Sequence, residues 1–368
     1  MIQPKTIGFI GFGLIGGSIA RNLRAIYPDA TIIAYNYKPN HTNPNLLLAV
    51  EDHVLNRLVS SFDDGFQNCD LIFLCAPVLR NISYLSELVS IIKPTCILTD
   101  VGSVKGNIHV SVKELGLEAN FIGGHPMAGS EKTGYEHSTM ELLENAFYVL
   151  TPTPKTSKST LTFMEDLVKN IGAIPIVLPP CDHDDIMAAI SHVPHIIAAA
   201  LVNMVQDNDD AQEHMHALAA GGFKDLTRIA SSSPVMWENI CLTNSESIVS
   251  FTDKYISYLE SMKKAILAKD TGFLMDFFSR SKAYRDSVPN KPIGAIGKIQ
   301  QIHINVADRK GAIATIATIL ASHDVSIKNI GILHNREDCS GVLFIEFYDE
   351  TSYLEARKVL SSYNYCIE

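Results

Sequence analysis

The chain opens with an apolar run, a glycine-rich turn and a helical pattern. Thr6–Ile10 is typical of a short strand, and the segment from Gly17 to Leu23 is typical of a helix. Between them, a G-x-G-x-x-G turn can bind a dinucleotide, because its glycines allow a tight turn, the approach of a pyrophosphate and close helix–strand packing. The helix N-terminus then holds the negative charge. We therefore predict a nucleotide cofactor on Gly11, Gly13, Leu14, Ile15 and Gly16.

Strand and helix signals alternate over roughly the first 170 residues. Further apolar runs at 31–35, 71–76, 96–99 and 121–124 predict buried strands. Strands that alternate with helices favour a parallel sheet in an α/β fold, and ligands of such sheets bind beyond the carboxyl ends of the strands. This rule selects the residues that follow the predicted strands, namely Asn36, Pro77, the segment from Asp100 to Ser103, and His125.

The pattern changes twice farther along the chain. From about Asp182 to Ser287 helical patterns replace the strand signals, and prolines and glycines between 289 and 297 then mark a linker. Behind it, strands expected at 302–306, 325–330, 342–347 and 365–367 and helices at 313–320 and 353–360 give the order βαββαβ. We predict a Rossmann-type domain at 1–172, an all-helical domain at 173–288 that supports a homodimer, and a ferredoxin-like domain at 298–368.

The net charge and the cysteine content argue against several classes of protein. The formal net charge of −10 argues against non-specific nucleic-acid binding. Seven cysteines without a CxxC pair argue against a disulfide scaffold or a cysteine zinc site and fit a reducing cytosol. The segment from Ile186 to Val205 carries no Asp, Glu, Lys or Arg and is long enough to span a membrane. It contains two histidines and a proline behind an acidic flank, so we expect a buried core helix in a cytoplasmic protein.

Two residues behind predicted strands can carry chemistry. His125 lies in a glycine-rich turn, where a histidine with a pKa near neutrality can accept a hydroxyl proton as hydride leaves. Alternatively, His125 only orders its loop. Ser103 can orient His125 or the nicotinamide amide, and it can equally cap the helix that follows.

The helical region offers two further groups of polar residues. His192 and His195 are three residues apart and share a helix face. Because no HExxH pattern is present and Pro194 intervenes, substrate contacts or core packing are favoured over a metal site, and we expect no metal. Farther on, Arg228 can bind a carboxylate through two hydrogen bonds and Lys224 can add a point charge. A helix start with an ordinary surface ion pair explains that stretch equally well.

Asn36 bears on the choice of cofactor. It follows the second predicted strand, 20 residues after Gly16. An acid at this place would bond the ribose diol and repel a 2′-phosphate, whereas asparagine bonds the diol without repulsion. Because Lys38 would attract a phosphate, these residues leave both NAD and NADP open.

Five motifs, taken in order, resemble those of the prephenate dehydrogenase family and the related arogenate dehydrogenases. They are GFGLIGGS (11–18), DVGSVKG (100–106), GGHPMAGSEKTG (123–134), SHVPH (191–195) and GGFKDLTRIA (221–230). The resemblance implies an NAD(P)-dependent oxidative decarboxylation, in which prephenate loses hydride from C4 and CO2 from C1 to give 4-hydroxyphenylpyruvate, the precursor of tyrosine. NAD is favoured because no arginine follows Asn36, although many family members that use NAD carry an acid there.

The resemblance also assigns roles to residues of this chain. His125 would bond the C4 hydroxyl and draw off its proton, and Ser103 would support His125 and the nicotinamide. Arg228 would hold the substrate carboxylate, and His195 would contact the substrate from the helical domain. The pocket would further be lined by Ser130, Glu131, His192 and Lys224.

The tail at 298–368 resembles an ACT domain, a regulatory module that binds amino acids. Tyrosine, the product of the pathway, is the expected effector. The loop from Asp308 to Ala312 has N–H groups that can receive a carboxylate. The resemblance places the effector between paired domains, near Asp308, Gly311 and Ala312 and facing Asn329. A tail that merely stabilises a dimer is the alternative.

Two other functions remain open at this point. Arogenate carries an amino group where prephenate has a keto group, and an acid facing that side chain would discriminate between the two. A nucleotide-dependent sensor without turnover is the alternative from a different class, and the presence of His125, Ser103 and Arg228 argues against it.

Overall fold

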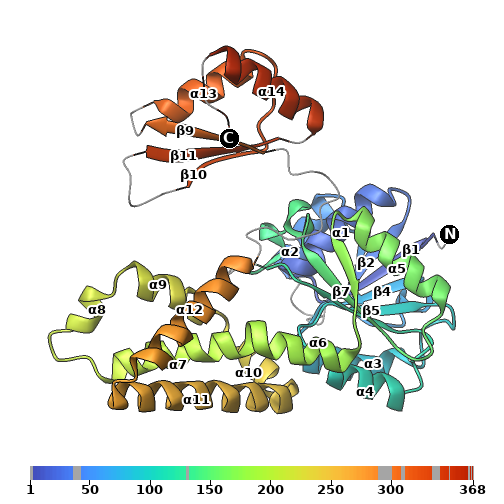
Figure 1. Cartoon of the computed structure of the whole chain (residues 1–368). Helices are drawn as coiled ribbons and strands as arrows, with labels where there is room; N and C mark the ends of the chain where they lie inside the picture. Colours follow the sequence, from blue (N-terminus) through green and yellow to red (C-terminus); the bar gives the residue numbers. More distant parts are fainter. Residues whose placement is uncertain are drawn as a thin grey trace. The chain divides into compact units, whose positions relative to one another are not determined.

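The computed structural model describes residues 3–35, 43–129, 132–288, 301–307, 311–333, 340–347, 349–363, 365 and 367. The chain divides into two compact units, Met1–Pro292 and Ile293–Glu368 (Figure 1). The helices that follow residue 179 belong to the same unit as the N-terminal sheet, so the domain boundary near residue 172 stays a prediction.

The first unit begins with alternating strands and helices. A parallel sheet has the order β3-β2-β1-β4-β5, and its strands are β1 (Thr6–Ile10), β2 (Thr31–Tyr35), β3 (Arg57–Val59), β4 (Leu71–Leu74) and β5 (Ile97–Asp100). The connections contain α1 (Leu14–Ile26), α2 (Pro44–Glu51), η1 (Phe66–Asn68), α3 (Val78–Leu88) and α4 (Gly106–Glu114). The direction of strand addition reverses between β1 and β4, and this is the point where such sheets bind ligands.

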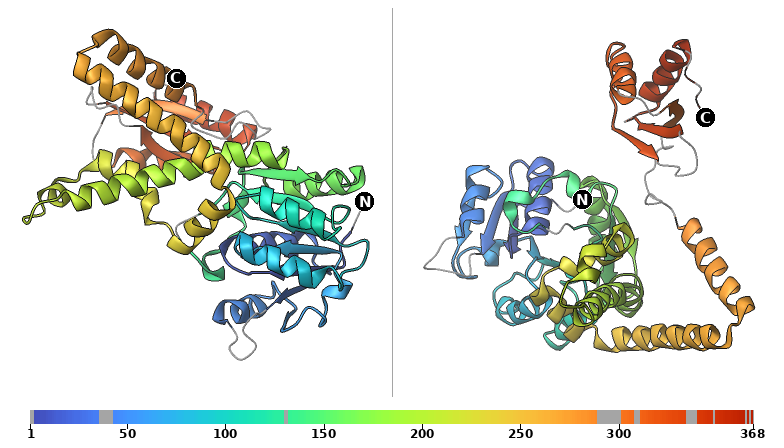
Figure 2. Two further views of the ribbon diagram at one scale, coloured as in Figure 1. Left: turned by 90° about the horizontal axis from the view of Figure 1, so that it is seen from below. Right: turned by 90° about the vertical axis from the view of Figure 1, so that its left-hand side faces the viewer.

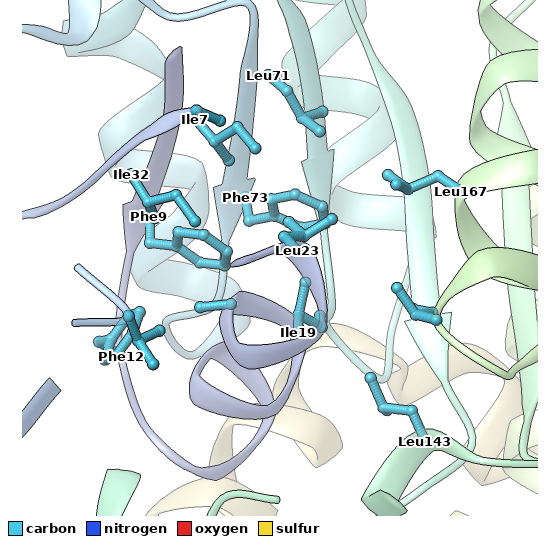
Figure 3. Packing of buried hydrophobic residues seen from close by; sticks show 14 of the residues in the cluster. Ile7, Phe9, Phe12, Ile19, Leu23, Ile32, Leu71, Phe73, Leu143 and Leu167 are labelled. Carbon is cyan, nitrogen blue, oxygen red and sulfur yellow. The ribbon is translucent and has the colours of Figure 1, made fainter. Parts of the chain in front are cut away.

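Alternate residues of each strand enter two different hydrophobic clusters. On one face Phe9 and Phe73 stack with ring centroids 5.1 Å apart and pack with Ile19 and Leu23 of α1 (Figure 3). On the other face the strand neighbours, Ile10 among them, pack with residues of α3 and α4. Because successive strand residues point to opposite faces and helices cover both, the central strands β1 and β4 are almost entirely apolar.

A smaller mixed sheet continues the first unit. β6 (Ile122–Pro126) pairs antiparallel with β7 (Phe147–Pro152), which pairs parallel with β8 (Ile174–Val177). A bridge between Leu98 and Phe121 links β5 to the start of β6. The remaining elements of this region are η2 (Tyr135–His137), η3 (Glu141–Leu143) and α5 (Lys158–Asn170). The region is thus Rossmann-like, as predicted, but it is not parallel throughout.

Helices alone follow β8 in this unit. α6 (Pro180–Met187), the π-helical turn η4 (Ala188–His192) and α7 (Val193–Asp207) form one helix, and α11 (Ser245–Ala268) lies along it (Figure 1). The others are α8 (His214–Leu218), α9 (Gly221–Thr227), η5 (Arg228–Ser231), α10 (Pro234–Thr243) and α12 (Thr271–Ser287). The widened turn stands directly before Pro194, which lacks the N–H that a regular helix would use there.

The helical region leaves much apolar surface uncovered. The helix Pro180–Asp207 passes a membrane-span test by length and composition, and 28% of its most apolar window is buried. This burial is lower than we expected for a core helix, because one side of it faces no other part of the described chain. On α12, which is described in full, no residue is buried, and the helix projects from the body of its unit (Figure 2).

The second unit is small and has a core of its own. It contains β9 (Gln301–Ala307), α13 (Ala312–Ala321), β10 (Asn329–Leu333), β11 (Ser340–Glu346) and α14 (Glu350–Ser362), and its antiparallel sheet has the order β10-β11-β9. Of the predicted last strand, residues 365 and 367 are described, and Ile367 forms a bridge with Ile304. β10 begins later than predicted. Val325, where the strand was expected to start, instead packs into the core from the turn after α13.

Candidate active site at the carboxyl ends of the strands

The glycine turn between β1 and α1 is tight at two glycines and open at the third. Gly11 has φ of 88°, and a Cβ there would lie 2.5 Å from the backbone nitrogen of Ala76. A Cβ on Gly16 would lie 2.9 Å from the carbonyl oxygen of Gly11. Nothing lies within 4 Å of the Cβ position of Gly13, so backbone can approach a ligand there. α1 begins at Leu14 without a side-chain cap, which leaves its first N–H groups to a ligand.

The turn after β4 packs against this glycine turn. Pro77 precedes α3 and is exposed. Buried Asn81 accepts a hydrogen bond from the N–H of Ala76 at 3.1 Å and donates one to the carbonyl of Leu74 at 3.1 Å. No sequence pattern indicated Asn81, although its amide holds the turn that carries Pro77. Gly13 and Pro77 therefore lie beyond the ends of adjacent strands.

A buried ion pair joins the end of β5 to β6. Lys105 Nζ bonds the carboxylate of Asp100, and both side chains are fully buried. Lys105 Nζ also donates to the carbonyl of Gly124 at 2.7 Å, while Asp100 accepts from the N–H groups of Gly102 and Gly124. Each charge is thereby compensated, and the loop that contains Ser103 is fastened to the strand that carries His125.

Ser103 is not the helix cap that we offered as an alternative. The cap position of α4 is Lys105, and the N–H groups of Lys105 and Gly106 donate to the carboxylate of Asp184 at 2.8 and 2.7 Å. The side chain of Ser103 makes no hydrogen bond within the described residues and is half-buried. Its hydroxyl is therefore available to a ligand.

His125 lies within β6 rather than directly after it. The strand runs two residues farther than predicted, and His125 pairs with Val149 of β7. The Nδ1 atom of His125 lies 2.8 Å from Nε2 of His183 on α6. His183 is fully buried, and its Nδ1 lies 2.7 Å from the carboxylate of Asp184. Sequence analysis missed both residues, because they stood in what read as an acidic helix flank.

Burial lowers the pKa of His125 well below its usual value, and the nearby His183, Lys105 and His192 lower it further. A neutral imidazole is the form that can accept a proton. The site therefore holds His125 ready as a base at neutral pH.

His192 and His195 face the indole of Trp237. The rings of His195 and Trp237 stack with centroids 3.9 Å apart, and His195 Nδ1 bonds the carbonyl of Ser191 at 2.9 Å. His192 is 1% exposed, and its Nδ1 lies 3.1 Å from the amide nitrogen of Asn244. That amide nitrogen also donates to the carbonyl of Asp184, so it is the donor to His192. The other nitrogen of His192, Nε2, has no partner among the described residues and is left as a donor.

A cavity of about 600 Å³ lies beside these rings, between α7, η5 and α10, and His195, Ser232 and Trp237 are among its lining residues. Arg228 is exposed on η5, which packs against α7. Burial lowers the pKa of His195, and the charge of Arg228 lowers it further. Lys224 is exposed one helical turn earlier, on α9. Of the predicted site residues in this region, His195 thus lines the cavity, and Arg228 directly precedes its lining residue Ile229.

Several predicted site residues lie outside the described residues, namely Asn36, Ser130, Glu131 and Asp308. In the second unit, Gly311 has φ of 85° and precedes α13, which begins at Ala312. Asn329 is exposed at the start of the edge strand β10. In the part of the chain that the structure describes, no group of three or more His, Cys, Asp or Glu side chains could hold a metal ion.

Comparisons with known proteins cover nearly the whole chain. Residues 19–177 match the nucleotide-binding domain of prephenate dehydrogenase, and residues 179–280 match the dimerization domain of that enzyme. A prephenate dehydrogenase of Bacillus subtilis is 36% identical over 98% of this chain and 97% of its own length.

Solved structures show the same similarity. The prephenate dehydrogenase of Aquifex aeolicus, in complex with hydroxyphenyl propionate and NAD+, superimposes with a TM-score of 0.72 at 30% identity. It is aligned over 99% of its own length and covers 78% of this chain. An arogenate dehydrogenase from Synechocystis superimposes with a TM-score of 0.68 at 29% identity over 77% of this chain and all of its own.

Proposed function

Since the chain belongs to the prephenate dehydrogenase family and catalyses the NAD-dependent oxidative decarboxylation of prephenate, we propose that His125 accepts the proton of the substrate's C4 hydroxyl. The observation that carries this proposal is the position of His125. It lies at the carboxyl end of β6, and its pKa is lowered by burial. As hydride leaves C4 and CO2 leaves C1, a neutral imidazole draws off the hydroxyl proton and so stabilises the positive charge that develops at C4, and the proton returns to the oxygen of the aromatic product.

The glycine turn fits the cofactor. The open space at Gly13 and the uncapped N-terminus of α1 suit a pyrophosphate, and Pro77 lies at the neighbouring strand end. When bound, NAD accepts the hydride of the substrate. Leu14 and Ile15 of the first helical turn would contact the dinucleotide, and the free hydroxyl of Ser103 would bond the nicotinamide amide or the substrate.

Positive charge and polar rings supply the rest of the substrate site. Arg228 would hold a substrate carboxylate, with Lys224 adding a second positive charge nearby. The donor Nε2 of His192 and the ring of His195 would contact the substrate from the helical side, and Ser130 and Glu131 would complete the pocket. Because aromatisation drives the reaction, the protein has mainly to orient the donor carbon and balance charge.

An absorbance assay at the reduced-nicotinamide band tests this function with prephenate and arogenate, each with NAD and NADP. We expect the highest kcat/KM with prephenate and NAD. His125→Asn should lower kcat by about 10²-fold or more while the affinity for NAD is kept. Normal turnover in that variant would remove His125 from the chemistry.

Arogenate is the second candidate substrate, and the similarity to the Synechocystis arogenate dehydrogenase favours testing it. In the same assay, a higher kcat/KM with arogenate than with prephenate would make arogenate the preferred substrate.

Pairing of two chains would cover the apolar surface of the helical region. Large apolar side chains are exposed along α11 and α12, among them Leu267 at 75%, Met275 at 70% and Phe278 at 62%. Patches of this extent usually mark interfaces, and residues 179–280 match a dimerization domain. We therefore expect a homodimer by sedimentation velocity, in a protein that works in the cytoplasm.

The second unit would act as a regulatory ACT domain. Its strands and helices follow each other in the predicted order, and the Bacillus subtilis relative matches 98% of this chain, whereas the Aquifex aeolicus chain covers 78% of it. A related enzyme thus exists without this unit. Tyrosine would bind near Gly311, Ala312 and Asn329 and favour a less active state, since a ligand shifts an equilibrium only through differential affinity.

Truncation after residue 292 tests the role of the tail. Tyrosine is titrated against the full chain and the truncated chain, and the rate with prephenate is measured. We expect inhibition of the full chain only. Equal inhibition of both forms, or of neither, would contradict a regulatory tail.

A further inference from the structure

A buried carboxylate stands behind the two histidines of the site. Asp184 is 7% exposed, and its oxygens accept hydrogen bonds from two backbone N–H groups at the start of α4. This position favours the ionised form, because the N-terminus of a helix attracts negative charge. A carboxylate in this form can only accept hydrogen bonds.

Because Asp184 can only accept, the positions of the hydrogens on His183 and His125 can be assigned in turn. Because Asp184 only accepts, the Nδ1 atom of His183, 2.7 Å away, carries a hydrogen. A neutral His183 then has a bare Nε2, which accepts. The Nδ1 atom of His125, 2.8 Å from it, must therefore donate, and the hydrogen-bond network leaves Nε2 of His125 without a proton.

We propose that Asp184 and His183 are positioning residues that fix His125 in the tautomer with a bare Nε2. The inference rests on the proposed function, because it concerns the same proton acceptor. In the reaction the O–H bond of the substrate breaks and an N–H bond forms at Nε2 of His125, and once CO2 has left the same proton returns to the phenolate oxygen of the product. The positive charge then lies beside the accepting nitrogen of His183, and Asp184 balances it at the end of the chain.

The other groups around His125 cannot do this. Burial, and then His183, Lys105 and His192, lower the pKa of His125. A neutral His183 adds no opposing charge and accepts a hydrogen bond, whereas the cation of Lys105 opposes the charge that develops on His125. Asp100 is occupied by Lys105 and by backbone N–H groups. Among the described residues, the acidic group that reaches His125 through hydrogen bonds is Asp184.

Two substitutions of His183 separate positioning from packing. His183→Gln can still place an oxygen near Nδ1 of His125, whereas His183→Asn reaches only toward Asp184. We expect His183→Asn to lower kcat by about 10²-fold, with KM and the dissociation constant of NAD within about twofold of wild type. His183→Gln should keep kcat within about tenfold, because the acceptor is restored.

His109→Asn is the matched control. His109 is half-buried and bonds a neighbouring hydroxyl, Thr151 Oγ1 at 2.9 Å, and no hydrogen bond or ring contact joins it to His125 in the described part of the chain. Its substitution should leave kcat within about twofold of wild type. Asp184→Asn is less suitable, because Asp184 also holds the start of α4.

The outcomes decide the proposal. Wild-type kcat in His183→Asn, or equal losses in the Asn and Gln variants, would overturn the positioning role. If His125→Asn has lost turnover while His183→Asn is normal, the positioning role fails and the proposed function stands. If His125→Asn itself turns over normally, the proposed function fails first.

Discussion

At the scale of single residues, charge in this site is placed where it can act on a ligand or where it is fully compensated. Arg228 is exposed next to the helix that carries His195, and its charge adds to burial in lowering the pKa of that histidine. Lys105 and Asp100, by contrast, are buried and neutralise each other. The first arrangement suits substrate binding, and the second suits the fixing of a loop.

Arg228→Ala should therefore raise KM for prephenate with a smaller change in kcat. Loss of a charge-assisted hydrogen bond costs about 1.5–3 kcal/mol, or roughly a 10- to 150-fold change in KM. Steady-state kinetics measure this effect, with Arg57→Ala as a control because Arg57 pairs with Asp64 in a surface loop. An unchanged KM would return Arg228 to an ordinary surface role.

Sequence patterns predict the residues that directly follow an apolar run, and they miss the residues that act by positioning another side chain. His125 and Ser103 follow apolar runs and are visible for that reason. His183 and Asp184 are brought to the site by contacts between elements far apart in the chain, such as the contact between His125 and His183, which are separated by 58 positions. No local pattern encodes such a contact.

At the scale of elements, two glycines of the turn between β1 and α1 have different roles, and substitutions can test each role separately. Gly11 is required by backbone conformation and by the neighbouring turn, whereas the space at Gly13 is open. One glycine therefore serves the fold, and the other serves the ligand.

Gly13→Ala should keep the melting temperature within a few degrees and weaken NAD binding by about tenfold or more, since a methyl group fills the space for the pyrophosphate. Gly11→Ala should lower the stability by about 1–3 kcal/mol, because of its positive φ and the close backbone contact. Differential scanning fluorimetry and fluorescence titration with NAD measure the two effects. A Gly13→Ala variant with normal NAD affinity would contradict the assignment of the turn.

The strong apolar runs predicted most central strands, and the weak ones were overlooked. β3 has three residues, and β8 contains Pro175, which is tolerated because β8 is an edge strand. Neither shows a clear period. The antiparallel pairing of β7 with β6 depends on tertiary contacts, so the alternation of strands and helices could not reveal it.

At the scale of the whole molecule, several buried histidines link folding to pH. Burial lowers the pKa of His109 and His192 to about 4. In the unfolded chain both would titrate near 6.5. Between these values the unfolded state binds more protons, so stability falls as the pH is lowered.

We expect the free energy of unfolding to fall by at least about 1.4 kcal/mol, the value of one pKa unit, between pH 6.5 and pH 4. Urea unfolding at fixed protein concentration measures this change. His109→Gln should reduce the fall in this range. Asp70, whose pKa is lowered by hydrogen bonds from Lys93 and backbone groups, adds its effect only below about pH 4. A stability that is flat from pH 6.5 to 4 would contradict neutral buried histidines.

The bond between Lys105 and Asp100 also constrains how this enzyme can diverge. Replacing either residue alone leaves a buried charge without its partner and lowers the free energy of unfolding by about 3–5 kcal/mol, whereas replacing both by apolar residues can leave the stability unchanged. Substitution at position 100 therefore depends on position 105, and a path that changes one residue at a time passes through a strongly destabilised intermediate. Lineages that keep one of these residues should keep the other.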